Sequence, residues 1–209
     1  PNPGGCENMK FPLVFFRGGE YDGRCFYLRP VVNEGGVGMI ARVYEEHKAK
    51  APKSVNCMVV TCSDSRTKET DKTGQLVIEL LKKNSHEVLA YHVVKDEAKE
   101  IQKVIESAAK DRRFQAVILN GGTGLTKRDT TVEVLERLLE KKLDGFGEFF
   151  RALGFQEIGS PAMLSRATAG VYQGKAIFSI PGSEDAAKLA MERLILPELG
   201  HITYLMGQA

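Results

Sequence analysis

A glycine-rich stretch in the second half of the chain has residue types suited to holding a phosphate. The apolar residues 117–119 lead into residues 120–124, Asn-Gly-Gly-Thr-Gly. Val and Ile favour a buried strand, and glycines let the backbone turn with positive φ close to a ligand. Lys127, Arg128 and Asp129 follow, and two cations with a carboxylate suit a phosphate and its Mg²⁺. The stretch indicates a phosphate-binding loop; by itself, it is equally typical of a tight strand-to-helix turn.

The common glycine-rich fingerprints do not fit this loop. It contains no Gly-x-Gly-x-x-Gly, and no Gly-Lys-Ser or Gly-Lys-Thr follows it. An ordinary dinucleotide-binding fold and a P-loop are therefore excluded.

The elements that must position the loop can be predicted from apolar spacing. Buried strands are expected at 56–62, 87–94 and 114–119, because these runs are nearly continuous in apolar residues. Helices are expected at 43–51, 73–83, from Asp96 onward, and at 131–142, where Thr130 and Glu133 have capping-box spacing. Residues 168–172 and 175–180 flank Gln173-Gly174 and predict an antiparallel hairpin. A short helix is expected from Gly145, and another from Ser183 toward Glu198, with Pro197 bending its end.

Alternating strands and helices predict an α/β fold. We expect a three-layer sandwich with a mostly parallel central sheet, an antiparallel hairpin edge and helices on both faces. Ligands of such sheets bind outside the carboxyl ends of the strands. The polar loops 63–68, 95–96, 120–130 and 181–183 should therefore meet in one crevice.

Composition and charge limit the partners and the location that we expect for this protein. The chain has 209 residues, 43% of them hydrophobic, with a net charge of +2. No nucleic-acid or membrane partner is expected, because the charge is small and no apolar run approaches ~20 residues. Cys57 and Cys62 are too far apart on one strand to form a disulfide, which favours a reducing, cytoplasmic location. We expect an N-terminal extension over 1–39 and a single domain over 40–209.

One motif resembles part of a zinc-binding site, but the rest of that site is missing from the sequence. Cys62-Ser63-Asp64-Ser65-Arg66 resembles the Cys-x-Asp-x-Arg loop of β-class carbonic anhydrases, which also need a later His-x-x-Cys. No cysteine follows Cys62, and a zinc site normally needs three or four protein ligands. We therefore reject this interpretation.

The loops taken together resemble the molybdopterin adenylyltransferase family, which comprises molybdenum cofactor biosynthesis protein B, its relatives and the matching domain of gephyrin-type proteins. The resemblance runs from about Val55 to the C-terminus and excludes 1–39. Its order and spacing make it specific. The matching pieces are Ser63-Asp64-Ser65-Arg66, Asp71-Lys72-Thr73-Gly74, Asp96-Glu97, Gly121-Gly122-Thr123-Gly124, Arg128-Asp129-Thr130-Thr131, Gly145-Phe146-Gly147-Glu148, Leu164-Ser165-Arg166 and Pro181-Gly182-Ser183.

The resemblance implies a reaction. ATP and molybdopterin would give adenylyl-molybdopterin and pyrophosphate with Mg²⁺, and catalysis would be mostly positioning and charge neutralisation. Asp96 and Asp129 would be the catalytic and Mg²⁺-binding residues, although both could instead cap helices. The resemblance carries over as substrate-binding residues Ser63, Gly121, Gly122, Thr123, Gly124, Glu148, Ser165, Arg166, Pro181, Gly182 and Ser183. Arg166 could bind a phosphate through two N–H groups, and Asp64 with Arg66 could form an internal pair.

The resemblance also implies partners. The family forms homotrimers or homohexamers, and the product could pass to a molybdate-inserting protein. A non-catalytic molybdopterin-binding or scaffold protein of the same fold is the main alternative, and a generic nucleotide-binding domain is a third.

Overall fold

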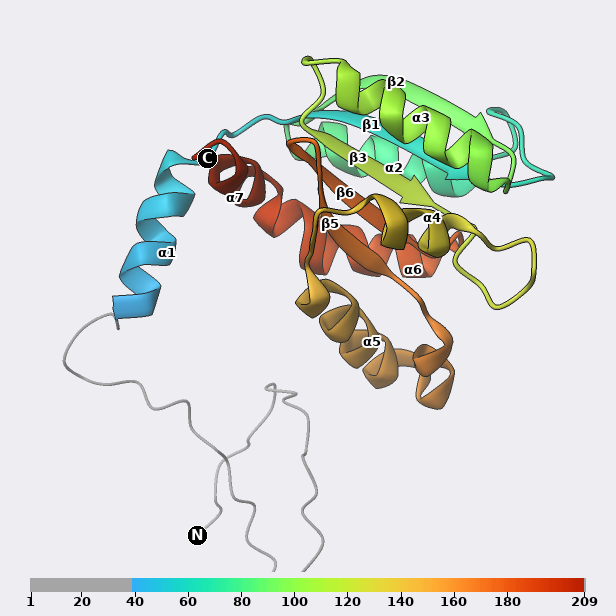
Figure 1. The fold of residues 1–209 in the computed structure, drawn as a ribbon. Helices are drawn as coiled ribbons and strands as arrows, with labels where there is room; N and C mark the ends of the chain where they lie inside the picture. The colour runs from blue at the N-terminus through green and yellow to red at the C-terminus, as the bar shows by residue number, and fades with distance from the viewer. Residues whose placement is uncertain (1–38, 209) are drawn as a thin grey trace, which may run out of the picture.

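A six-stranded sheet organises the chain (Figure 1). The computed structural model describes residues 39–208, with side chains from residue 43 onward. The spatial strand order is β2-β1-β3-β6-β5-β4. The strands are β1 (Asn56–Cys62), β2 (Glu87–Val94), β3 (Ala116–Asn120), β4 (Lys141–Lys142), β5 (Thr168–Tyr172) and β6 (Lys175–Ile180). The helices are α1 (Met39–Lys50), α2 (Lys72–Lys83), α3 (Ala98–Lys110), α4 (Thr131–Leu138), α5 (Asp144–Ile158), α6 (Glu184–Ala190) and α7 (Leu196–Met206).

Four strands of the sheet are parallel. Strand β1 pairs in parallel with β2 and β3, and β3 pairs in parallel with β6. All residues of β3 and β6 are buried, as expected for strands that helices cover on both faces. The predicted mostly parallel α/β sheet is confirmed, and its carboxyl ends lie along one edge.

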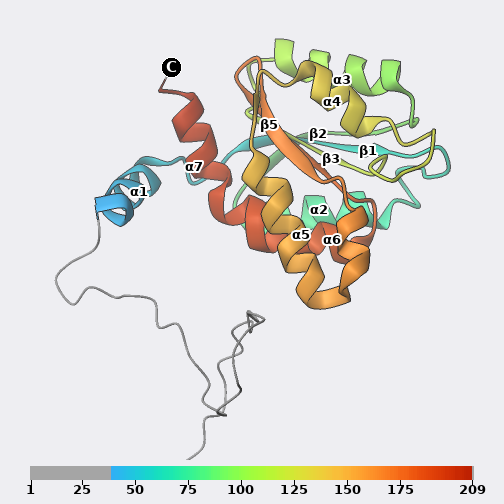
Figure 2. The ribbon, with the colours of Figure 1, turned by 60° about the horizontal axis from the view of Figure 1, so that its bottom comes forward.

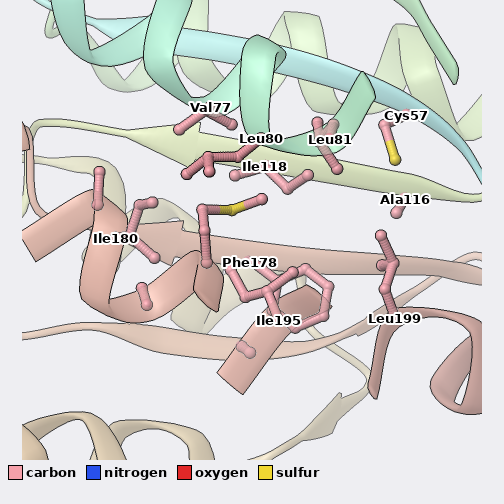
Figure 3. Packing of buried hydrophobic residues seen from close by; sticks show 14 of the residues in the cluster. Cys57, Val77, Leu80, Leu81, Ala116, Ile118, Phe178, Ile180, Ile195 and Leu199 are labelled. Atoms are coloured by element: carbon pink, nitrogen blue, oxygen red, sulfur yellow. The ribbon is translucent and has the colours of Figure 1, made fainter. Parts of the chain in front are cut away.

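Helices form the two outer layers (Figure 2). The face that carries Cys57 and Ile118 packs against α2, α5, α6 and α7 (Figure 3). The opposite face, with Val60 and Leu119, packs against α3 and α4. Successive strand residues point to opposite faces, so these two cores share the sheet between them. The three-layer sandwich is confirmed.

The antiparallel edge of the sheet has one more strand than the predicted hairpin. Strands β5 and β6 form the predicted hairpin, with positive φ at both Gln173 and Gly174, as a type I′ turn requires. The helix expected over 131–142 ends at Leu138, because Lys141 and Lys142 pair with β5 as the short strand β4. The helix expected from Gly145 begins at Asp144 and runs to Ile158.

The C-terminal helix also differs from the prediction. Helical backbone continues beyond Glu198 to Met206, and a π-helical segment, Met191–Ile195, separates α6 from α7. Pro197 lies in the first turn of α7, where a missing N–H costs little. Pro197 therefore begins a further helix and does not lie at the end of the predicted one.

Helix α1 contacts the rest of the described chain through α7. Tyr44 donates a hydrogen bond of 2.8 Å to Glu198, and Lys48 lies 3.3 Å from the same carboxylate. The predicted helix at 43–51 is confirmed with an earlier start. The predicted extension over 1–39 lies outside the described residues except for Met39, which begins α1. Within 39–208, no helix combines the length and the apolar character that crossing a membrane requires.

Candidate active site

The loops at the carboxyl ends of β1, β3 and β6 meet in one open polar cleft of about 540 Å³. It contains most of the site residues expected from the sequence. Its lining residues are Cys62, Ser63, Ser65, Arg66, Gly121, Gly122, Thr123, Gly124, Asp129, Pro181, Gly182 and Ser183. The parallel sheet brings together three of the four expected loops, as its topology predicts, whereas the loop 95–96 does not line the cleft.

Close backbone packing explains two of the glycines. Gly121 has φ +94°, and a Cβ there would lie 2.3 Å from the carbonyl oxygen of Cys62. A Cβ on Gly182 would lie 3.2 Å from the Cα of Gly121. The three strand ends therefore contact one another backbone to backbone, and side chains are excluded between them.

Gly122 separates the cleft from a buried carboxylate. Its φ is +64°, and an added Cβ would lie 2.5 Å from Oδ1 of Asp96 and 2.2 Å from Oγ1 of Thr131. Asp96 is buried. Burial, followed by the negative charges of Asp129 and Asp64, raises the pKa of Asp96. Asp96 is therefore a carboxylate that would gain from a nearby cation.

Asp129 lines the cleft and is held in one orientation. Its carboxylate accepts hydrogen bonds from the backbone N–H of Thr126 at 2.9 Å and from its hydroxyl at 2.5 Å. Burial would raise the pKa of Asp129, but these hydrogen bonds and one from Gly124 outweigh it and lower the pKa. Neither Asp96 nor Asp129 caps the helix that follows it, because the N-cap positions of α3 and α4 are Glu97 and Thr130.

Arg166 clamps the glycine-rich loop. Its guanidinium donates to the backbone carbonyls of Thr123 at 3.1 Å and Asp129 at 3.2 Å, and it forms an ion pair with Glu133. The capping box expected from Thr130 and Glu133 is wrong, because Glu133 binds Arg166 and Thr130 makes no cap hydrogen bond. Arg166 does not line the polar cleft.

The internal pair of Asp64 with Arg66, one of the alternatives that the sequence left open, does not form. Asp64 binds Arg128 through two hydrogen bonds of 3.0 and 2.8 Å, and so connects the first loop to the glycine-rich loop. The backbone N–H of Asp96 donates to the same carboxylate at 3.2 Å. Arg66 instead pairs with Asp71 at 3.3 Å.

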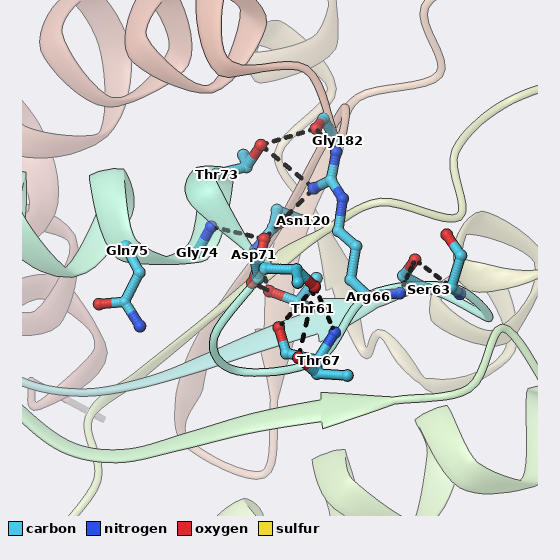
Figure 4. A network of polar contacts seen from close by, with 12 residues as sticks. Thr61, Ser63, Arg66, Thr67, Asp71, Thr73, Gly74, Gln75, Asn120 and Gly182 are labelled. Carbon is cyan, nitrogen blue, oxygen red and sulfur yellow. Dashed lines mark hydrogen bonds and ion pairs between the residues drawn. The ribbon is translucent and has the colours of Figure 1, made fainter.

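The buried carboxylate of Asp71 is the centre of a hydrogen-bond network that the sequence did not reveal as part of the site (Figure 4). It accepts from the hydroxyls of Thr61 and Tyr91 and from the N–H of Gly74 at 3.0 Å. Burial would raise the pKa of Asp71, yet these donors and Arg66 lower it. The sequence signals were the matching piece Asp71-Lys72-Thr73-Gly74 and the position of Asp71 before α2, which is typical of an N-cap.

A second cleft adjoins the first and is mainly apolar. It has a volume of about 380 Å³ and shares Thr123, Gly124, Pro181 and Ser183 with the polar cleft. Phe150 and Leu164 line it, together with the expected site residue Ser165. Glu148 is exposed on α5 and lines neither cleft.

The carboxylates suit a Mg²⁺ ion that a nucleotide brings with it. The described residues contain no group of three or more potential ligands from His, Cys, Asp and Glu. Mg²⁺ usually keeps several waters and binds one or two carboxylates plus substrate phosphates. Asp129 lines the cleft and fits that requirement, whereas Asp96 lies behind Gly122 and does not line the cleft. Burial raises the pKa of the Cys62 thiol to about 12, which disfavours a thiolate ligand.

Comparison with known proteins agrees with this geometry. The model of a family described as "probable molybdopterin binding domain" matches residues 58–201, which include every loop of the cleft. The chain belongs to this molybdopterin-binding domain family.

Members of the family resemble the chain over most of its length. Molybdenum cofactor biosynthesis protein B of Halalkalibacterium halodurans is 55% identical over 159 residues, covering 76% of this chain and 94% of that protein. The Bacillus subtilis protein of that name is 52% identical over 159 residues, with the same coverage of both chains.

Solved structures of the family share the fold. A crystal structure of a molybdenum cofactor biosynthesis protein B has a TM-score of 0.74 and 51% identity, covering 76% of this chain and 99% of its own. The tungsten cofactor synthesizing protein MoaB from Pyrococcus furiosus has a TM-score of 0.66 and 39% identity, covering 73% and 96%.

Proposed function

We propose that this protein acts in molybdenum cofactor biosynthesis and transfers AMP from ATP to molybdopterin, with Mg²⁺, giving adenylyl-molybdopterin and pyrophosphate. The observation that carries the proposal is the position of Asp129 in a cleft walled by the backbone of Gly121–Gly124 and by Ser63 and Gly182. Relatives 52–55% identical are named molybdenum cofactor biosynthesis protein B, which supports the pathway.

The reaction joins two polyanions. The terminal phosphate of molybdopterin attacks the α-phosphorus of ATP, a new P–O bond forms, and the bond to pyrophosphate breaks. Such a transfer requires alignment and charge neutralisation more than covalent chemistry by the protein. Mg²⁺, when bound, would neutralise the phosphate charge. The backbone of the glycine-rich loop approaches the phosphates without side chains in the way.

The two carboxylates have separate tasks in this proposal. Asp129 is fixed by Thr126 and stays ionised because its pKa is lowered, so it can hold the metal at the cleft. Asp96 lies buried behind Gly122 and would orient metal-bound water or the loop backbone. The clamp that Arg166 forms on Thr123 and Asp129 keeps the loop in place.

The apolar cleft provides room for a flat ring. Phe150, Pro161 and Leu164 line it, and Ser165 and Ser183 supply hydroxyl groups. A ring system of one substrate would lie here while its phosphate reaches the polar cleft, because the two clefts share Thr123 and Gly124. Glu148 remains a proposed substrate residue, although it is exposed on α5 and lines neither cleft.

Replacing Asp129 tests the proposal. Purified protein, molybdopterin, Mg²⁺ and α-labelled ATP should yield labelled pterin, and Asp129→Ala should lower the rate at least ~100-fold because it removes a metal ligand. Molybdopterin should still bind the variant. Unchanged turnover would remove Asp129 from the mechanism. If the wild-type protein binds molybdopterin but transfers no AMP, the non-catalytic binding protein is favoured. If it binds ATP without any dependence on the pterin, a generic nucleotide-binding domain is favoured.

We also propose that the protein forms homotrimers or homohexamers and hands its product to a molybdate-inserting protein. Large apolar side chains are exposed on α5 and on the short 3-10 helix Ser160–Leu164 that follows it; Phe149 is 66% exposed and Met163 74% exposed. Surfaces of this kind are typical of protein interfaces. Light scattering coupled to gel filtration would give the mass of the assembly.

A further inference from the structure

Arg66 brings a positive charge to the polar cleft. Of the described residues that line the cleft, it alone is basic. Its side chain lines the cleft and is 35% exposed. The glycines around it contribute no side chains, and Asp129 contributes a negative charge. Arg66 is therefore the cleft's own cation for an anionic ligand.

The guanidinium of Arg66 has donors to spare. Nη1 donates to Asp71 at 3.3 Å and to Thr73 at 3.2 Å, and Nη2 donates to the carbonyl of Gly182 at 3.1 Å. Arginine has five N–H donors in a planar fork. The Nε–H and one hydrogen of Nη2 make no hydrogen bond within the described part of the chain. Nε and Nη2 share one edge of the guanidinium, which matches two oxygens of a phosphate.

The other two arginines near the cleft are already occupied. Nε and Nη2 of Arg128 both bind Asp64, at 3.0 and 2.8 Å. Nε and Nη2 of Arg166 bind the carbonyls of Thr123 and Asp129, and Nη1 binds Glu133. A ligand would have to break these contacts to use either fork, whereas Arg66 needs no rearrangement.

We propose that Arg66 binds two oxygens of a phosphate group in the polar cleft, and that Asp71 is the positioning residue that holds its guanidinium. The identity of the phosphate as part of ATP or its pyrophosphate product rests on the proposed function. Asp71 is buried and held by Thr61, Tyr91 and Gly74, so it is a rigid anchor. Ser63 adds a hydroxyl, whose oxygen accepts a hydrogen bond from the backbone N–H of Arg66 at 3.3 Å.

Calorimetric titration with inorganic pyrophosphate and Mg²⁺ tests this assignment. Arg66→Gln should weaken binding about 10- to 100-fold, because a charge-assisted pair of hydrogen bonds is lost. Arg66→Lys keeps the charge without the fork and should weaken binding about 10-fold. Arg113→Gln is the control with the same change of charge: Arg113 is paired with Asp111 in the loop before β3, at the opposite end of the sheet from the cleft. It should bind pyrophosphate like the wild-type protein.

The role of Asp71 has its own readout. Asp71→Asn should weaken pyrophosphate binding less than Arg66→Gln, and the double variant should bind no more weakly than Arg66→Gln alone, because the two residues act through one contact. Additive losses would overturn the positioning role. If Arg66→Gln does not fold, Arg66→Lys decides.

The outcomes separate this inference from the proposed function. Wild-type affinity in folded Arg66 variants, or no pyrophosphate binding by the wild-type protein, would overturn the inference. If the wild-type protein transfers AMP but the Arg66 variants bind pyrophosphate as tightly as it does, the inference is overturned and the proposed function stands. Pyrophosphate binding that needs Arg66, in a protein without transferase activity, would overturn the proposed function and keep the phosphate site.

Discussion

Two buried carboxylates near this cleft, Asp96 and Asp71, have pKa values that shift in opposite directions. Asp96 is a buried carboxylate near two other carboxylates, and its pKa is raised by burial first and by their charges second. Asp71 is buried as well, but its many donors lower its pKa. The fold gives Asp71 enough hydrogen-bond donors to stabilise its charge, but it does not do so for Asp96. A buried carboxylate that keeps a raised pKa is typical of a functional site.

Replacing Asp96 should therefore separate stability from activity. Because the pKa of Asp96 is raised in the folded state, the ionised form destabilises the fold above the unfolded-state pKa, and the penalty disappears in acid. Asp96→Asn should melt at a higher temperature than the wild-type protein near pH 8, with the difference vanishing toward about pH 4, while transfer is lost.

Thermal unfolding across this pH range checks the prediction. Asp64→Asn is a control of opposite sign, since its hydrogen bonds with Arg128 lower the pKa of Asp64 and its removal should not raise the melting temperature. An Asp96→Asn protein that is less stable than the wild type at pH 8 would contradict the account.

At the scale of elements, the strand ends are packed too closely for side chains. Gly121 and Gly174 both have positive φ, but only Gly121 has a backbone atom, the Cys62 carbonyl oxygen, within 2.3 Å of an added Cβ. A Cβ on Gly174 would meet nothing within 4 Å. An added Cβ at Gly174 therefore tests the cost of a positive φ alone, whereas at Gly121 it also tests the cost of a steric clash.

Alanine at these two glycines should have unequal effects. Gly174→Ala should cost about 1 kcal/mol, the penalty for a positive φ, and leave transfer intact. Gly121→Ala should cost at least about 3 kcal/mol, because the strand ends must separate, and should abolish transfer. Urea unfolding and the transfer assay give both numbers, and equal destabilisation by the two variants would refute the packing argument.

The sequence predicted elements better than contacts. The bounds of β1, β2, β5 and β6 could be read from apolar runs and the Gln173-Gly174 turn. The end of α4 could not, because Lys141 and Lys142 become a strand only through pairing with β5. Pro197 was misjudged for a similar reason: sequence does not reveal that it occupies the first turn of a further helix.

Side-chain partners were the least predictable feature of the cleft. Polar loops after buried strands identified Ser63, Gly121–Gly124, Asp129 and Gly182 as neighbours. An internal pair of Asp64 with Arg66 was one alternative from the sequence, yet each binds a residue from farther along the chain. Such partner choices depend on the exact approach of loops, which local spacing does not encode.

For the whole molecule, the buried residues of the described core indicate where the domain begins. Both hydrophobic clusters are built from residues between Val55 and Leu199, and the family model matches 58–201. We therefore propose that 40–209 is the domain and that 1–39 is an extension outside it.

Removing residues 1–38 tests this division. A variant that begins at Met39 keeps α1 and its contacts with Glu198, and should retain both the melting temperature and the transfer rate within about twofold. Circular dichroism and the transfer assay measure these quantities. Loss of folding on truncation would show that the domain boundary is wrong.

The destination of two labels tests the central claim most directly. Wild-type protein, molybdopterin and Mg²⁺ would be mixed in parallel with α-labelled and with γ-labelled ATP in a single turnover. The account predicts the α-label on the pterin and the γ-label in pyrophosphate, because attack occurs at the α-phosphorus. The γ-label on the pterin, or neither label on a pterin that is bound, would contradict adenylyl transfer.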